Sequence, residues 1–150
     1  MRDDINQALK EAIKSKSSRR ASTLRLIVAA IKDRDIAARG ADKVDGVSDD
    51  EILEILSKMV KQRVEAAHTY KEAGREELAA QELEEIDIIQ GFLPRQLSDE
   101  EAHGAVAKVI ADLGASGLKD MGKVMGELKA RHTGEMDFGK ASGLVKELLG

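Results

Sequence analysis

A single proline, Pro94, occurs in the 150 residues of this chain. On both sides of it, apolar side chains recur at three- and four-residue spacing, which is the period of an amphipathic helix. Aromatic residues make up only 2% of the chain and hydrophobic residues 42%, so aliphatic side chains must fill the core. That composition favours helices over strands, and no alternating pattern is long enough for a strand. The sequence therefore predicts an all-α protein.

Signals for helix starts and stops divide the chain into seven expected helices. Ser48 and Ser98 each precede acidic residues at the spacing of a capping box. The polar stretch Gly40–Val47 holds two glycines and is expected to be a loop. Side chains expected to face inward include Ile13, Leu83 and Leu113. The helices are expected at about residues 3–13, 19–39, 49–70, 76–92, 99–113, 121–133 and 138–148.

Pro94 also marks the expected boundary between two units. The residue before a proline is displaced from helical backbone angles, so a helix ends at this point. Four expected helices, two of them long, precede the proline, and three short ones follow it. We therefore expect an N-terminal helical domain over residues 1–93 and a small three-helix tail domain over residues 94–150.

The composition narrows the classes of function. The net charge is −4 and the pI is near 5.5, so the bulk charge does not indicate a nucleic-acid-binding protein. Without cysteine, the chain has no disulfides and no thiolate metal sites. The longest apolar run, Leu26–Ile31, is far shorter than the roughly 20 residues of a membrane span, and no signal peptide is recognisable. We therefore expect no membrane association and, by default, a cytoplasmic location.

No residue pattern predicts a catalytic, cofactor-binding or metal site. The three histidines lack partners at the spacing of a metal motif and are expected to be solvated. The carboxylates between Glu76 and Asp87 are expected on the wet face of a helix, whereas acid–base pairs need an apolar pocket. No serine-nucleophile sequence of the type G-x-S-x-G occurs. The residues alone thus favour a protein that is not an enzyme.

Charge is distributed unevenly along the chain. Residues 16–39 carry seven basic and two acidic residues, a net of +5, and residues 76–101 carry nine acidic residues and one arginine, a net of −8. Arg25, Lys32 and Arg39 recur every seven residues and therefore form one stripe along a helix. Mutual pairing of the two segments, or simple solvation, is one explanation, with each surface pair worth at most about 1 kcal/mol. A stripe that follows a phosphate backbone is the other.

A glycine-rich segment in the tail allows two explanations. It nearly matches a phosphate-binding P-loop, but Val124 stands where the magnesium-binding hydroxyl belongs, and no strand precedes it. Gly122 and Gly126 lie four residues apart on one side of a short expected helix, where each glycine costs about 1 kcal/mol relative to alanine. Close packing against another helix of the tail is the favoured explanation. An RNA backbone resting against the glycines, with Lys119 and Lys123 contacting phosphates, is the alternative.

Four short stretches carry a family resemblance over essentially the whole chain. They are Arg25–Ile27, Lys61–Arg63, Phe92–Ser98 and Asp120–Gly126. In this order and spacing they resemble the YqeY-like family, which is similar to the tail region of the B subunit of glutamine-dependent Asp-tRNA/Glu-tRNA amidotransferases. The resemblance implies a helical N-terminal unit followed by a three-helix tail.

The resemblance also implies a function. In the amidotransferases the tail region helps to hold the tRNA while other domains perform the chemistry, and those catalytic domains have no counterpart here. The chain is thus expected to be a non-catalytic, tRNA-binding accessory module without cofactors. The residues expected to contact RNA are Lys119, Gly122, Lys123 and Gly126, with help from Arg25, Lys32 and Arg39.

Two other functions stay open. One is a protein–protein adaptor that supports an amidotransferase or another translation enzyme. The other is the family-level activity of a carbon–nitrogen ligase with glutamine as amido-N-donor, for which the sequence shows no recognisable nucleophile, metal site or nucleotide site. The sequence gives no indication of the oligomeric state.

Overall fold

The computed structural model describes residues 1–39 and 46–150. Over these residues the chain forms seven α-helices, one short 3₁₀ turn and no strand, which confirms the all-α prediction. Most of the loop expected at Gly40–Val47 lies outside the described residues. The elements are α1 (Arg2–Lys14), α2 (Ser18–Arg39), α3 (Asp49–Glu72), α4 (Glu76–Gln90), α5 (Asp99–Leu113), η1 (Leu118–Asp120), α6 (Met121–His132) and α7 (Phe138–Leu149).

The chain separates into two compact units, Met1–Leu93 and Pro94–Gly150. Each unit has a hydrophobic core of its own. No helix in the described ranges is long and apolar enough to cross a membrane.

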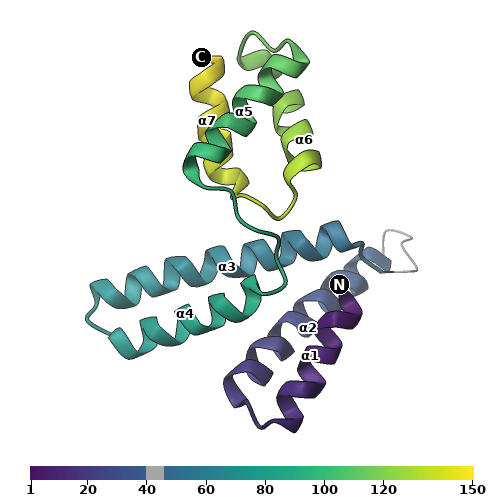
Figure 1. Ribbon diagram of the computed structural model, residues 1–150, viewed down its shortest axis with the longest axis vertical. Coiled ribbons are helices and arrows are strands. Elements are labelled where there is room, and N and C mark those ends of the chain that lie inside the picture. Colours follow the sequence, from purple (N-terminus) through teal and green to yellow (C-terminus); the bar gives the residue numbers. More distant parts are fainter. Residues whose placement is uncertain (40–45) are drawn as a thin grey trace. The chain divides into compact units, whose positions relative to one another are not determined.

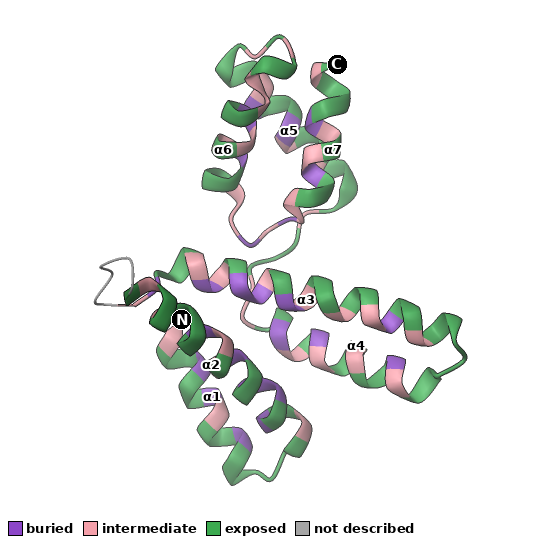
Figure 2. Cartoon of the chain, turned by 180° about the vertical axis from the view of Figure 1, so that it is seen from behind, coloured by how far each residue is buried: buried purple, intermediate pink, exposed green. Residues whose placement is uncertain are grey.

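The N-terminal unit consists of two helical hairpins (Figure 1). The first pairs α1 with α2 and the second pairs α3 with α4, while α2 also packs on α4 and, over a shorter stretch, on α3. Figure 2 shows buried residues on the inward faces of these helices. The largest fully buried side chains of this core are aliphatic, as the composition predicts: Ile5, Leu24, Ile27, Ile52, Leu56 and Ile89.

A network of hydrogen bonds joins three segments of this unit. The Arg2 guanidinium donates to both carboxylate oxygens of Asp35, at 2.7 and 3.0 Å, and to the Val47 carbonyl at 3.3 Å. The Val47 amide donates in turn to Asp35 Oδ1 at 2.9 Å. The beginning of α1, the last turns of α2 and the residues before α3 are therefore tied to one carboxylate. The hydrogen bonds from Arg2 and from the Val47 amide lower the pKa of Asp35 to about 2.

The tail unit packs α5, α6 and α7 against one another around a core that includes Val106, Val109, Val124, Leu128 and Val145. The predicted capping box at Ser98 is confirmed. The Ser98 side chain accepts a hydrogen bond from the Glu101 amide at 3.1 Å. The Glu101 carboxylate in turn accepts one from the Ser98 amide, also at 3.1 Å. The Ser48 side chain accepts a hydrogen bond from the Glu51 amide at 3.3 Å and caps the start of α3.

Several side chains expected in the core are exposed instead. Ile13, Leu83 and Leu113 are 50%, 44% and 42% exposed. On α4, the buried positions are Ala79, Ile86 and Ile89. The face of α4 that packs inward is therefore the one that carries these three residues, and Leu83 lies to one side of it. Ile13 and Leu113 lie at the ends of α1 and α5, where fewer neighbours cover them.

We predict that Gly46→Ala destabilises the protein more than Gly74→Ala. Both glycines have left-handed backbone angles, with φ of +85° and +71°, which cost other residues about 1–2 kcal/mol. A Cβ at Gly46 would also lie 2.6 Å from Asp35 Oδ1, an atom fixed by its hydrogen bonds, whereas a Cβ at Gly74 meets no atom within 4 Å. Urea unfolding of both variants measures the difference, and equal losses would contradict the proposed crowding.

We also predict that Asp35→Asn lowers the free energy of unfolding near neutral pH. Because the pKa of Asp35 is lowered in the folded protein, its contribution is fully present above the unfolded pKa, near 4, and is lost as the pH falls through about 2. The difference in free energy of unfolding between wild type and Asp35→Asn should therefore become smaller as the pH falls from 4 to 2. Asp33→Asn, an exposed position on the same helix, is the control in the same urea titrations, and equal narrowing for both variants would contradict the role of Asp35.

Candidate nucleic-acid interface

One face of α6 belongs to the core of the tail unit. Val124 and Leu128 are fully buried, and Met121 and Met125 pack against the same core. The turn before the helix is held by Asp120, whose carboxylate accepts from the Ser116 amide at 3.0 Å. These contacts account for the aspartate, the valine and the methionines of the segment Asp120–Gly126.

The remaining residues of that segment face outward. Gly122, Lys123 and Gly126 are exposed. A Cβ built on Gly122 or Gly126 would meet no atom of the described chain within 4 Å. Close packing of these glycines within the tail, the favoured explanation from the sequence, is therefore wrong. The reason is the helical wheel, because Val124 and Leu128 direct the opposite side of α6 into the core.

Lysine side chains flank the open glycines. Lys119 in η1 and Lys123 in α6 are exposed. Within the described ranges neither forms an ion pair, whereas Arg131 near the other end of α6 is held by Asp112 and Glu127 at 2.8 Å each. This end of the helix thus presents two available positive charges beside uncovered main chain. The structure brings together Lys119, Gly122, Lys123 and Gly126 as one surface, which we call the α6 surface.

The other predicted contact residues lie in the N-terminal unit. Arg25, Lys32 and Arg39 are exposed along α2, and Arg39 helps to lower the pKa of Asp35. Arg25 and Lys32 form no ion pair with any residue that the structure describes.

Pairing between the basic and acidic segments is limited. Arg19 of α2 lies 3.3 Å from Glu84 of α4, whereas Arg34 lies 3.9 Å from Glu54 of α3, which is outside the acidic segment. Among the described residues, mutual pairing of the two segments therefore accounts for Arg19, but not for Arg25 or Lys32.

A half-buried ion pair corrects the expectation that all the α4 carboxylates are solvated. Glu85 is 21% exposed and accepts from Arg63 Nε at 2.9 Å, and Arg63 also donates to the Met59 carbonyl at 3.1 Å. Burial and the neighbouring Glu85 raise the pKa of Glu82. The arginine of the Lys61–Arg63 stretch thus joins α3 to α4 and has a structural role.

The stretch around Pro94 also has a structural role. Arg95 pairs with Glu101 at 2.7 Å. The Gln96 side chain donates to the Gly134 carbonyl at 2.7 Å, and the Leu97 amide donates to the Glu135 carbonyl at 2.9 Å. These bonds fasten the residues after Pro94 to the tail unit, so they are engaged in holding the fold.

The histidines differ in their exposure. His68 is 73% exposed and lies 3.0 Å from Glu72. His132 is only 24% exposed, and its Nδ1 lies 3.4 Å from Glu135, so the expectation that all three are solvated is wrong for this one. The backbone turn after α6, in which the Glu135 amide donates to the His132 carbonyl, brings the Glu135 carboxylate near Nδ1 of the ring, which spacing alone does not reveal. Among the described residues, no group of three His, Asp or Glu side chains is placed to hold a metal ion.

Comparison with known proteins gives one family and several relatives. The model of the family described as "Yqey-like protein" matches residues 2–149. A relative from Kluyveromyces lactis, named "Altered inheritance of mitochondria protein 41, mitochondrial", is 28% identical over 84% of this chain and 72% of its own length. Proteins of the same name from Clavispora lusitaniae and Meyerozyma guilliermondii are 35% and 36% identical over 62% and 59% of this chain, and the matches span 52% and 44% of those proteins.

These relatives correct one prediction. The expected cytoplasmic location is wrong, because the relatives are named as mitochondrial proteins. That expectation rested on the absence of an apolar signal segment, and mitochondrial targeting segments are amphipathic and arginine-rich instead. The match over residues 2–149 spans nearly the entire sequence. The chain belongs to the Yqey-like protein family.

Proposed function

We propose that this protein is a non-catalytic accessory module, related to glutamine-dependent tRNA amidotransferases, that binds tRNA through the α6 surface. One observation carries the proposal. Of the segment Asp120–Gly126, the residues without a role inside the fold are Gly122, Lys123 and Gly126.

The open glycines leave room for a ligand at the α6 surface. A glycine inside a helix costs about 1 kcal/mol relative to alanine, and no packing within the tail offsets this cost at Gly126. A sugar–phosphate backbone lying against the main chain would use the space that a side chain would fill. Lys119 and Lys123 would then contact phosphates, which position an RNA without reading its sequence.

The scarcity of aromatic residues favours one mode of RNA binding. The whole chain has one tyrosine, two phenylalanines and no tryptophan, so it lacks the aromatic platforms on which single-stranded bases stack. Backbone contacts to a folded RNA are therefore favoured over base recognition. Arg25, Lys32 and Arg39 on α2 would add phosphate contacts. With a net charge of −4, we expect a dissociation constant in the non-specific range, about 10⁻⁴ to 10⁻⁶ M at physiological salt.

We predict that the double variant Lys119→Glu/Lys123→Glu binds labelled tRNA more weakly than wild type. The logarithm of the binding constant falls with the logarithm of the salt concentration. Losing two phosphate contacts should make the slope of this line less steep by about two. The control is Lys140→Glu/Lys146→Glu, which makes the same charge change at exposed lysines of α7.

Each other outcome has a definite meaning. Equal binding by the test and control variants would remove the α6 lysines from the proposal. No binding by any protein, even at low salt, would favour the adaptor function.

A second prediction separates stability from binding. Gly126→Ala should raise the free energy of unfolding by about 1 kcal/mol, because the new methyl group meets open space, and it should weaken tRNA binding. Gly143→Ala, at an equally open helical position of α7, should stabilise the protein without affecting tRNA. Thermal unfolding and tRNA titration of both variants make the comparison. If Gly126→Ala binds tRNA as wild type does, no backbone approaches this glycine.

A further inference from the structure

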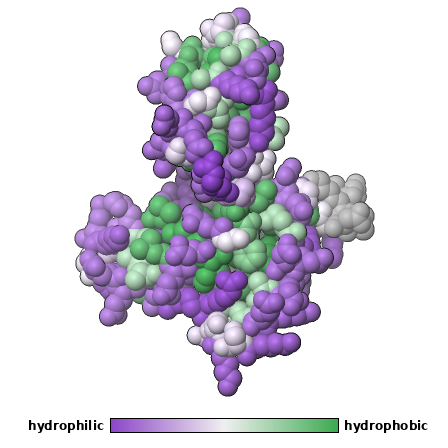
Figure 3. Space-filling model, viewed as in Figure 1, coloured by the Kyte–Doolittle hydropathy of each residue, from purple (hydrophilic) through white to green (hydrophobic). Residues whose placement is uncertain are grey.

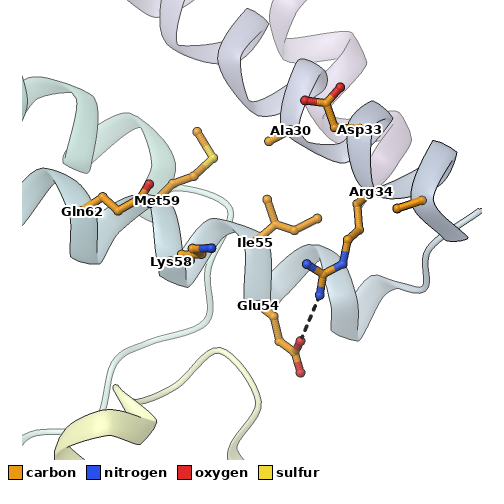
Figure 4. Close-up of a pocket in the computed structure, with 9 residues that line it drawn as sticks. Ala30, Asp33, Arg34, Glu54, Ile55, Lys58, Met59 and Gln62 are labelled. Atoms are coloured by element: carbon orange, nitrogen blue, oxygen red, sulfur yellow. Dashed lines mark ion pairs between the residues drawn. The ribbon is translucent and has the colours of Figure 1, made fainter.

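A groove of about 470 Å³ lies between α2 and α3 of the N-terminal unit (Figure 4). Its floor is apolar and consists of Ala30 and Ala37 from α2 and Ile55 and Met59 from α3. Since α2 packs mainly on α1 and α4, and α3 mainly on α4, the two helices contact each other only over a short stretch. The groove is therefore the place where the two hairpins of this unit leave apolar surface open between them.

The apolar surface continues along α2 beyond the groove. Leu26 is 47% exposed. It lies four, seven and eleven residues before Ala30, Asp33 and Ala37, and therefore on the same helical stripe. Figure 3 shows hydrophobic residues gathering over the middle of the N-terminal unit. The exposed Leu26 side chain therefore extends the apolar surface of the groove along α2.

The rim of the groove carries both signs of charge. Arg34 of α2 and Glu54 of α3 approach to 3.9 Å across it (Figure 4). Asp33 on the α2 rim and Lys58 on the α3 rim form no ion pair with any other residue that the structure describes. Each side of the groove therefore offers one unpaired charge, negative along α2 and positive along α3.

We propose that this groove binds an amphipathic helix of a partner protein. A floor of alkyl and thioether groups offers no hydrogen bonds to an extended peptide, whereas a helix satisfies its own backbone. The α3 wall runs from Glu54 to Gln62, roughly 12 Å at 1.5 Å per residue, or about two turns of helix. The flexible Met59 side chain can adapt to the apolar residues that enter.

Charge complementarity specifies the partner further. The apolar ridge of the partner helix faces the floor of the groove. A basic residue of that helix lies beside Asp33, and an acidic residue on its other flank lies beside Lys58. This inference goes beyond the proposed function and uses none of the residues assigned to RNA.

The test uses the full chain and three synthetic helical peptides with the same leucine ridge. One peptide has glutamate along one flank and lysine along the other, the second has glutamate along both flanks, and the third has lysine along both. Wild type should bind the mixed peptide most tightly, by roughly two- to five-fold for each matched rim charge. Fluorescence anisotropy measures the three affinities.

Charge variants should redirect this preference. Lys58→Glu leaves both rims acidic and should favour the lysine-flanked peptide, whereas Asp33→Lys should favour the glutamate-flanked one. Ala37→Glu places a carboxylate on the floor and should weaken all three peptides by about tenfold or more. Ala29→Glu, an exposed alanine of α2 outside the groove, is the matched control and should bind as wild type does.

Three results would overturn the proposal. They are the absence of binding by all three peptides, equal effects of Ala37→Glu and Ala29→Glu, and a peptide preference that neither rim variant changes. Sedimentation of the free protein supplies a further check. Self-association that Ala37→Glu abolishes would assign the groove to a second copy of this chain and likewise overturn the partner helix.

Discussion

The carboxylate of Asp35 holds together three parts of the N-terminal unit that are far apart in sequence. Arg2 at the start of α1 and the Val47 amide before α3 both donate to it, while Asp35 itself lies near the end of α2. The hairpin of α1 and α2 is thereby joined to the segment that begins α3. Gly46, with its left-handed backbone, belongs to the same arrangement, because a Cβ at this position would collide with the Asp35 carboxylate. Both faces of the α2–α3 groove depend on this junction.

The helices could be predicted from the sequence because their signals are local. Serine caps, the apolar period and the glycines after helices act over a few residues, and they placed most helix ends within about two residues of those observed. Features that need two helices to pack were not predictable in this way. Arg63 and Glu85 are 22 residues apart and meet only because α3 and α4 form a hairpin. Leu83 is exposed for the same kind of reason, since the packing angle of α4 decides which face is buried.

The family-like stretches divide into structural residues and residues without a structural role. Arg63 and Gln96 make hydrogen bonds that join elements of their units, and Val124 fills the tail core. Gly122 and Gly126 instead lie opposite the buried side of α6. A helical wheel centred on Val124 and Leu128 would have placed the glycines outside from the sequence alone. What the wheel could not give is the space above them, which depends on where α5 and α7 lie.

Open glycines recur on all three helices of the tail, at Gly104, Gly126 and Gly143. Each weakens the local helix, and the tail core is small and aliphatic. Such helices open more often by local unfolding, so their backbone amides should exchange with solvent deuterium sooner than those in the core of the N-terminal unit. A ligand that binds only the folded tail lowers the population of the open state by the factor 1 + L/Kd, where L is the free ligand concentration. The slowest-exchanging amides of α6 therefore provide a readout of any bound partner, whether or not the partner changes the shape of the protein.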